Sequence, residues 1–257
     1  MKRLAISSFK ISLLLLQLIF VWSQTAAQQF DWVQQIGSNK KTGADNMVAD
    51  GEGHLYVLGY FEDTIFFNPR FQAVDTLRGS NPNGSMFLAK FDTTGQLIGR
   101  KEITGQEYLN KAACLGLDRW GNIFVAGGFT GTIAFQTLSG IVSLSTRTHP
   151  KYNYPVEGFI CKLNSTGDYI WAKKIGEGSR GFSPLNLTTD NAGNVILAGN
   201  FSDSADLDPS SSNFMIYGDP SSVDIFICKL DGAGNFLWGG KTGDFWVDRT
   251  LDMTTDA

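Results

Sequence analysis

The chain repeats itself, and the length of the repeat constrains the fold more than any other feature. Three nine-residue segments align without gaps and begin 72 and 67 residues apart, at 87–95, 159–167 and 226–234. Two further columns follow this period, one marked by tryptophan (Trp32, Trp171 and Trp238) and one by Asp-x-x-Gly (Asp50, Asp118 and Asp190). Such repeats are typical of arrays in which each unit completes its hydrophobic core against the next.

Each repeat is predicted to contain two β-hairpins. The runs 55–61, 123–129 and 195–201 are rich in β-branched and aromatic residues, and each follows an Asp-x-x-Gly turn. A second Gly-containing turn, at 92–95, 164–167 and 231–234, precedes the tryptophan column. In the second repeat the four strands are predicted at 112–117, 123–129, 158–163 and 169–175.

The strands are almost continuously apolar, which indicates sheets covered on both faces. The predicted fold is therefore all-β, a β-propeller of four-stranded blades. An open β-solenoid also covers both faces of its sheets, but its repeats are usually much shorter. We expect the repeated glycines (Gly59, Gly127 and Gly199) to let neighbouring sheets approach closely, and the tryptophans to fill the space between sheets.

About three complete blades are predicted, at 46–103, 112–175 and 185–241. Residues 30–36 match the last strand of a blade, and residues 250–256 match the first strand of another. We therefore expect an incomplete propeller that occupies residues 28–257 and continues beyond the C-terminus.

The motif set resembles the bacterial SBBP-type β-propeller repeat. It reads Phe-Ile-Cys-Lys-Leu-Asp-x-x-Gly-Asn-x-Leu-Trp, then Asp-x-x-Gly-Asn-x-x-x-x-Gly-x-Phe, then Asp-Leu-Asp-Pro at 206–209, and it covers residues 30–257. Three positions depart from it: Gly99 replaces the tryptophan, Gln136 stands near the place of Asn68 and Asp208, and Thr242 replaces the usual isoleucine. The resemblance implies an exported or surface-exposed protein and supports the fold more than any activity.

Residues 1–27 are predicted to be a signal peptide. A basic start precedes the apolar run 11–22, and small residues at 25–27 offer a cleavage site. A membrane anchor would need roughly 20 apolar residues, and Gln17 interrupts this run. Cleavage would change the formal net charge from −4 to −7, which argues against nucleic acid as a partner. We expect secretion or display at the cell surface, with no membrane span after cleavage.

Three cysteines are present, and two occupy equivalent repeat positions: Cys161 and Cys228, where the first repeat has Ala89. A position that accepts alanine or cysteine is typical of a small buried strand residue, so we predict reduced thiols rather than disulfides. Cys114 stands outside this column.

Catalytic, cofactor-binding and metal-binding residues are not predicted, and the chain is not expected to be an enzyme. His54 replaces Asn122 and Asn194 in a turn, and His149 lies in an unrepeated loop. The equivalent lysines (Lys90, Lys162 and Lys229) form either a basic row on one rim or, as we favour, solvent-reaching strand caps. The acidic cluster Asp203, Asp206 and Asp208 is interpreted as a solvated loop, and calcium binding there is left open.

Recognition is expected in the unrepeated insertions 62–84, 130–157 and 202–224. Their tyrosines, Tyr152, Tyr154 and Tyr217, could stack on a glycan or a protein ligand. The favoured function is a non-catalytic extracellular scaffold or binding module. The alternative is the propeller part of a secreted carbohydrate- or peptide-processing enzyme whose catalytic residues lie outside this chain.

Overall fold

The computed structural model describes residues 32–67, 75–81, 84–103, 108–147, 156–243, 248, 250 and 252–255, with only the backbone at 108–113. The chain divides into two compact units, Met1–Val33 and Gln34–Ala257. Every regular element in the described residues is a β-strand of the second unit, so the predicted all-β class is confirmed.

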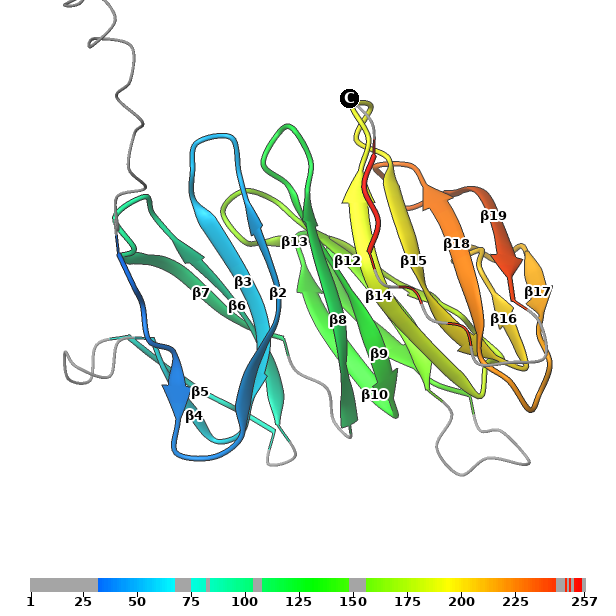
Figure 1. The fold of residues 1–257 in the computed structure, drawn as a ribbon, viewed down its shortest axis with the longest axis horizontal. Helices are drawn as coiled ribbons and strands as arrows, with labels where there is room; N and C mark the ends of the chain where they lie inside the picture. The colour runs from blue at the N-terminus through cyan, green and yellow to red at the C-terminus, as the bar shows by residue number, and fades with distance from the viewer. Residues whose placement is uncertain are drawn as a thin grey trace, which may run out of the picture. The chain divides into compact units, whose positions relative to one another are not determined.

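Three sets of four antiparallel strands form the blades of a β-propeller-type fold (Figure 1). The sheet of blade 2 extends to six strands, because the hairpin Thr132–Thr137 and Gly140–Ser145 joins the last strand of this blade through a parallel pairing, Thr137 with Tyr169. Blade 1 contains β2 (Thr42–Ala49), β3 (Leu55–Phe61), β6 (Ser85–Phe91) and β7 (Leu97–Ile103). Blade 2 contains β8 (Tyr108–Leu117), β9 (Ile123–Thr130), β12 (Glu157–Leu163) and β13 (Tyr169–Ile175). Blade 3 contains β14 (Gly181–Thr189), β15 (Val195–Ser202), β18 (Asp224–Leu230) and β19 (Phe236–Thr242). The first strand of blade 2, β8, packs against both β2 and β14.

The first strand of each blade begins four residues earlier than predicted. Each of these strands contains a β-bulge, between Ala44 and Asn46, between Asn110 and Ala113, and between Pro184 and Asn186. An extra residue in one strand breaks the pairing register. The apolar pattern therefore shows only the half of each strand that follows the bulge.

Gly59 and Gly199 make room for groups of their own sheet rather than for the approach of a neighbouring one, which corrects the prediction at these two positions. A Cβ on Gly199 would lie 2.1 Å from the carbonyl oxygen of Ser183 in the bulged strand and 2.9 Å from the ring of Phe226. A Cβ on Gly59 would lie at the same distance, 2.1 Å, from the carbonyl oxygen of Gly43. The bulge and the phenylalanine of the third strand thus leave no room for a side chain.

The insertions, predicted as loops, fold into small hairpins. They form β4 (Thr64–Phe66) with β5 (Thr76–Arg78), β10 (Thr132–Thr137) with β11 (Gly140–Ser145), and β16 (Ser204–Asp206) with β17 (Met215–Tyr217). A residue with positive φ precedes each hairpin: Asp63, Gly131 and Asp203. The following strands bury Ile65, Ile133 and Ala205 completely. The insertions therefore add to the hydrophobic core.

The two terminal strand predictions are not confirmed. Residues 32–36 form no strand, and the short β1 (Gly37–Ser38) pairs with β4 of the insertion hairpin instead. The described residues between 250 and 255 form no strand either. They nevertheless lie beside blade 3, because Thr255 Oγ1 donates to the Thr189 carbonyl (3.1 Å), as Thr189 Oγ1 donates to the Leu117 carbonyl (2.7 Å) of blade 2.

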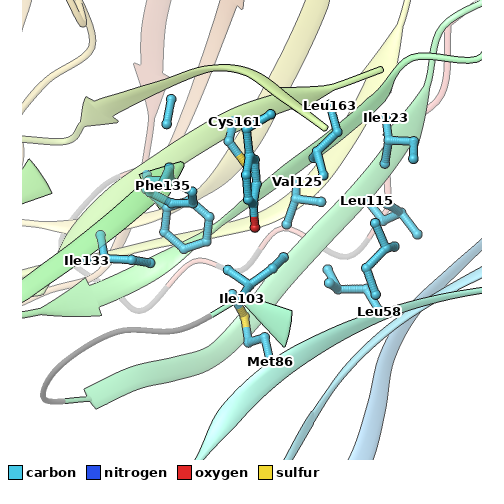
Figure 2. Close-up of a cluster of buried hydrophobic side chains, with 14 of the residues drawn as sticks. Leu58, Met86, Ile103, Leu115, Ile123, Val125, Ile133, Phe135, Cys161 and Leu163 are labelled. Atoms are coloured by element: carbon cyan, nitrogen blue, oxygen red, sulfur yellow. The ribbon is translucent and has the colours of Figure 1, made fainter. Parts of the chain in front are cut away.

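Hydrophobic side chains fill the spaces between the blades. One cluster joins blades 1 and 2, and Figure 2 shows its residues Leu58 and Met86 from blade 1 facing Leu115 and Val125 from blade 2. A second cluster joins blades 2 and 3. All eight residues of β9 are buried, as expected for a strand covered on both faces.

Candidate functional site

The hairpin turns gather the acidic residues of the repeats in one recurring structure. In the turn at Asp118, Oδ1 accepts hydrogen bonds from the backbone N–H groups of Trp120 (3.0 Å) and Asn122 (2.9 Å), and Oδ2 accepts one from Asn122 Nδ2 (2.7 Å). The same pattern of two backbone donors recurs at Asp50, Asp92, Asn164, Asp190 and Asp231. These side chains are the acceptors that hold the turns closed.

This geometry explains the acidity of the turn aspartates. Partial burial opposes ionisation of Asp190, but hydrogen bonds from Lys229 and Asn194 outweigh it and hold the pKa of Asp190 well below its usual value. Burial likewise opposes ionisation of Asp50, and the hydrogen bonds from His54 and Glu52 lower its pKa overall. These carboxylates are ionised hydrogen-bond acceptors, unlike a general acid.

His54 is a turn residue, as predicted. Its Nδ1 lies 2.9 Å from Asp50 Oδ2, where Asn122 and Asn194 place their amide groups in the other blades. His149 lies outside the described residues.

The repeated lysines form neither a free basic row nor solvent-reaching caps. Lys162 Nζ lies 3.4 Å from Asp118 Oδ2, and Lys229 Nζ lies 2.7 Å from Asp190 Oδ2, with side chains only 12% and 22% exposed. Each lysine crosses the sheet from the third strand to the first turn of its own blade. In blade 1, Lys90 instead places its ammonium 4.9 Å from the centre of the Tyr56 ring.

Two tryptophans of blade 2 contact turns of blade 3: Trp171, which is partly buried, and Trp120, with 56% of its surface exposed. The Trp171 ring packs edge-on against Phe124, 6.1 Å between centroids, and its Nε1 donates to the carbonyl of Gly232 in a turn of blade 3 (3.3 Å). Lys173 Nζ donates to the carbonyl of Gly234 in that turn (2.8 Å). Trp120 covers the other turn, since a Cβ on Gly193 would lie 2.4 Å from its ring.

Both tryptophans are missing at the equivalent places in blade 1, where Gly99 replaces Trp171 and Glu52 replaces Trp120. A cavity of about 420 Å³ opens beside Gly99, between Tyr56 and Lys101 of blade 1 and the turn 165–168 of blade 2. A second cavity of about 610 Å³ adjoins it and shares Tyr56, Lys90 and Ser165 with it. Together they form one groove along the rim, which we call the rim groove.

The charged groups that line the cavity beside Gly99 are mainly cationic, among apolar and neutral polar residues. Lys90, Arg100 and Lys101 lie on its blade 1 side, and Asp168 lies on its blade 2 side. Arg100 is already engaged, with Nε donating to the Thr76 carbonyl (2.9 Å). Lys101 Nζ lies 4.4 Å from the centre of the Tyr169 ring. The cavity therefore combines aromatic surface with net positive charge.

Carboxylates of the acidic cluster accept hydrogen bonds from backbone N–H groups. Asp206 Oδ1 accepts from the N–H groups of Asp208 (3.0 Å) and Phe214 (2.8 Å), and Asp208 Oδ1 accepts from Ser210 (2.9 Å). Asp203 occupies the positive-φ position before β16. In the described part of the chain, three or more metal-ligating side chains do not come together anywhere.

The remaining candidates are distributed as follows. Tyr217 lies on β17 with 68% of its surface exposed, whereas Tyr152 and Tyr154 lie outside the described residues. The three cysteines are free and fully buried, which confirms the predicted small core positions of Cys161 and Cys228. Burial raises the pKa of the Cys228 thiol to about 12.

Two features of the structure are absent from the sequence-based prediction. One is an ion pair between a buried acid at the start of the third strand and a lysine of the last strand. It joins Glu157 to Lys174 in blade 2 (3.2 Å) and Asp224 to Lys241 in blade 3 (3.4 Å). The other is the rim groove itself. In the sequence, the groove corresponds to Gly99 and Glu52, which stand where blade 2 has tryptophan. The repeat motif reveals the Gly99 replacement, but neither replacement by itself indicates a cavity.

Comparisons with known proteins support the repeat architecture. No family model matches the chain. The chain is 30% identical over 110 residues to an uncharacterized WD repeat-containing protein, L264, of Acanthamoeba polyphaga mimivirus. This match covers 37% of the chain and only 8% of the length of that relative. None of the described residues forms a helix long and apolar enough to cross a membrane. The sheets, the repeated turns and this similarity together identify a β-propeller-type repeat protein.

Proposed function

We propose that this chain is an exported, non-catalytic β-propeller module that binds a protein ligand in the rim groove. The observation that carries the proposal is the contrast between two neighbouring interfaces of one repeat array. Trp171 fills one, whereas Gly99 leaves the other open. Binding sites in proteins are typically preformed hollows with apolar walls and a few polar groups.

The turns make this groove a rigid site. Asp118 and Asn164 hold their turns by hydrogen bonds within the turn, so the walls of the groove do not depend on a ligand for their shape. A preformed site loses little conformational entropy on binding. The groove is therefore suited to recognition.

Export is proposed from the N-terminal pattern and from the resemblance to bacterial SBBP-type repeats. The intact mass of the protein released from the producing cells tests it directly. The expected mass is that of a chain that begins at residue 28. Retention of residues 1–27 in all of the protein would contradict it.

Binding can be tested with a phage-displayed library of random peptides selected on the purified chain. Selected peptides are expected to lose affinity for Gly99→Trp, which fills the groove, and to keep it for Gly99→Ala, which leaves the groove open. A Cβ at residue 99 would lie 3.6 Å from Lys90 Cβ, an ordinary contact, so both variants fit the backbone. Peptides that bind wild type and Gly99→Trp equally would place the binding surface elsewhere.

A second candidate is glycan binding at the insertion hairpins, favoured by the exposed ring of Tyr217. Loss of binding on a glycan array in Tyr217→Ala, with Gly99→Trp unaffected, would select this candidate.

A further inference from the structure

We propose that the cavity beside Gly99 is a receptor for an indole ring, supplied by a tryptophan side chain of the bound peptide. This inference rests on the proposed function and names the chemistry that the rim groove recognises. The repeat itself provides the argument, because it contains the same cavity with an indole already inside.

The residues that surround Trp171 have counterparts around Gly99. Phe124, which meets the Trp171 ring edge-on, corresponds to Tyr56, and Lys173, whose ammonium lies 6.0 Å from the Trp171 ring centre, corresponds to Lys101. Tyr56 and Lys101 both line the cavity. An aromatic edge and a cation are both favourable neighbours for an indole face.

The acceptor for the indole N–H is also repeated. Trp171 Nε1 donates to the carbonyl of Gly232, the second residue of its turn, and the corresponding residue of the facing turn in blade 2 is Ser165. Ser165 lines the cavity. A bound indole in the orientation of Trp171 would direct its N–H at this carbonyl.

The space occupied by the ring is open at this interface. A Cβ on Gly234 would lie 3.0 Å from the ring of Trp171, whereas a Cβ on the equivalent Gly167 would meet nothing within 4 Å. Gly167 lacks two neighbours that Gly234 has: the ring that residue 99 does not supply, and a lysine side chain, because Lys101 lies over the Tyr169 ring whereas Lys173 would be 3.1 Å from a Cβ on Gly234. Apolar and aromatic cavities of this kind bind small ligands that match the missing group.

The charge of the cavity predicts what accompanies the ring. In blade 2, Lys162 is neutralised by Asp118 and also donates to the Gly232 carbonyl (3.2 Å). In blade 1, Lys90 makes the same ring contact with Tyr56 that Lys162 makes with Phe124, but Asp50, the counterpart of Asp118, is paired with His54 instead of the lysine. With Lys90 and Lys101 both lining the cavity against Asp168 alone, a carboxylate beside the indole is favoured.

The test uses three fluorinated probes observed by ¹⁹F NMR with the full chain: 5-fluoroindole, 5-fluoroindole-3-acetate and 5-fluorotryptamine. The acetate is expected to bind roughly five- to tenfold more tightly than the amine, with the difference reduced by added salt. Gly99→Trp is expected to abolish binding of all three probes, and Gly99→Ala to retain it. Circular dichroism of both variants verifies that they fold.

The outcomes separate this inference from the proposed function. If no probe binds at millimolar concentration, or if Gly99→Trp binds the probes as well as wild type, the indole receptor is refuted. Library peptides that contain no tryptophan but lose binding in Gly99→Trp would refute the indole receptor and leave the binding groove standing. Library peptides that bind wild type and Gly99→Trp with equal affinity would refute both the indole receptor and the binding groove.

Discussion

Replacing Trp171 with glycine should open a second groove between blades 2 and 3 and destabilise the protein. Trp238→Gly is the matched control, because Trp238 occupies the same place in the last strand of blade 3 but is 46% exposed. Both changes remove the same side chain and introduce the same backbone freedom. The difference between their free energies of unfolding therefore isolates the contacts that Trp171 makes across the interface.

The expected difference is about 3 kcal/mol. The hydrogen bond from Trp171 Nε1 to Gly232 contributes about 1 kcal/mol, and the edge-to-face contact with Phe124 contributes about 1 kcal/mol. The additional apolar surface that Trp171 buries against the blade 3 turn contributes roughly another 1 kcal/mol. For a chain of this size the difference corresponds to roughly 6–12 °C in Tm.

Calorimetry or urea unfolding of both variants measures this difference. Indole added to Trp171→Gly should raise its Tm, since a ligand that binds the folded state stabilises it. Equal destabilisation by Trp171→Gly and Trp238→Gly would refute the view that tryptophan closes this interface. That result would also remove the basis for comparing the interface that contains Trp171 with the one that contains Gly99.

Three further predictions concern the repeat. Gly199→Ala should cost about 3 kcal/mol, because its Cβ would lie 2.1 Å from the Ser183 carbonyl, whereas Gly240→Ala, with nothing within 4 Å, should stay within about 0.5 kcal/mol; urea unfolding compares them. Asp190→Asn should lower stability by about 1–2 kcal/mol at pH 7. Because folding lowers the pKa of Asp190 from its ordinary value of 3.8, its contribution is present above that pH and is lost below it, so the variant and wild type should converge in acid melts. The buried thiols of Cys114, Cys161 and Cys228 should resist a thiol reagent in the native protein and react only after denaturation, and rapid labelling of the native protein would contradict their placement.

The sequence is sufficient to predict the strands that carry an uninterrupted local pattern. β3, β9 and β15 combine a turn signal with apolar residues on both faces, and these features locate all three. The early halves of β2, β8 and β14 escape prediction because a bulge places two residues opposite one and breaks the alternation. The insertion hairpins escape it because two of the three begin at an aspartate with positive φ, a position where glycine is the usual signal.

The rim groove could not be predicted because it is a property of two blades together. Gly99 is visible in the alignment as a departure, but its consequence depends on the turn of the next blade, which faces it only after folding. The lysines illustrate the same limit. Lys162 and Lys229 are surface residues by composition, and only the folded sheet brings each to within ion-pair distance of a turn aspartate.

The Asp-x-x-Gly turns separate the stability of a blade from the identity of its rim. Each turn closes on its first and last residues, so the two residues between them are free to differ: Gly51 and Glu52 in blade 1, Arg119 and Trp120 in blade 2, Asn191 and Ala192 in blade 3. Every blade thus has two turn positions at its edge that can be substituted while the hairpin keeps its fold. An array built this way can acquire a new specificity one turn at a time, while the scaffold below stays unchanged.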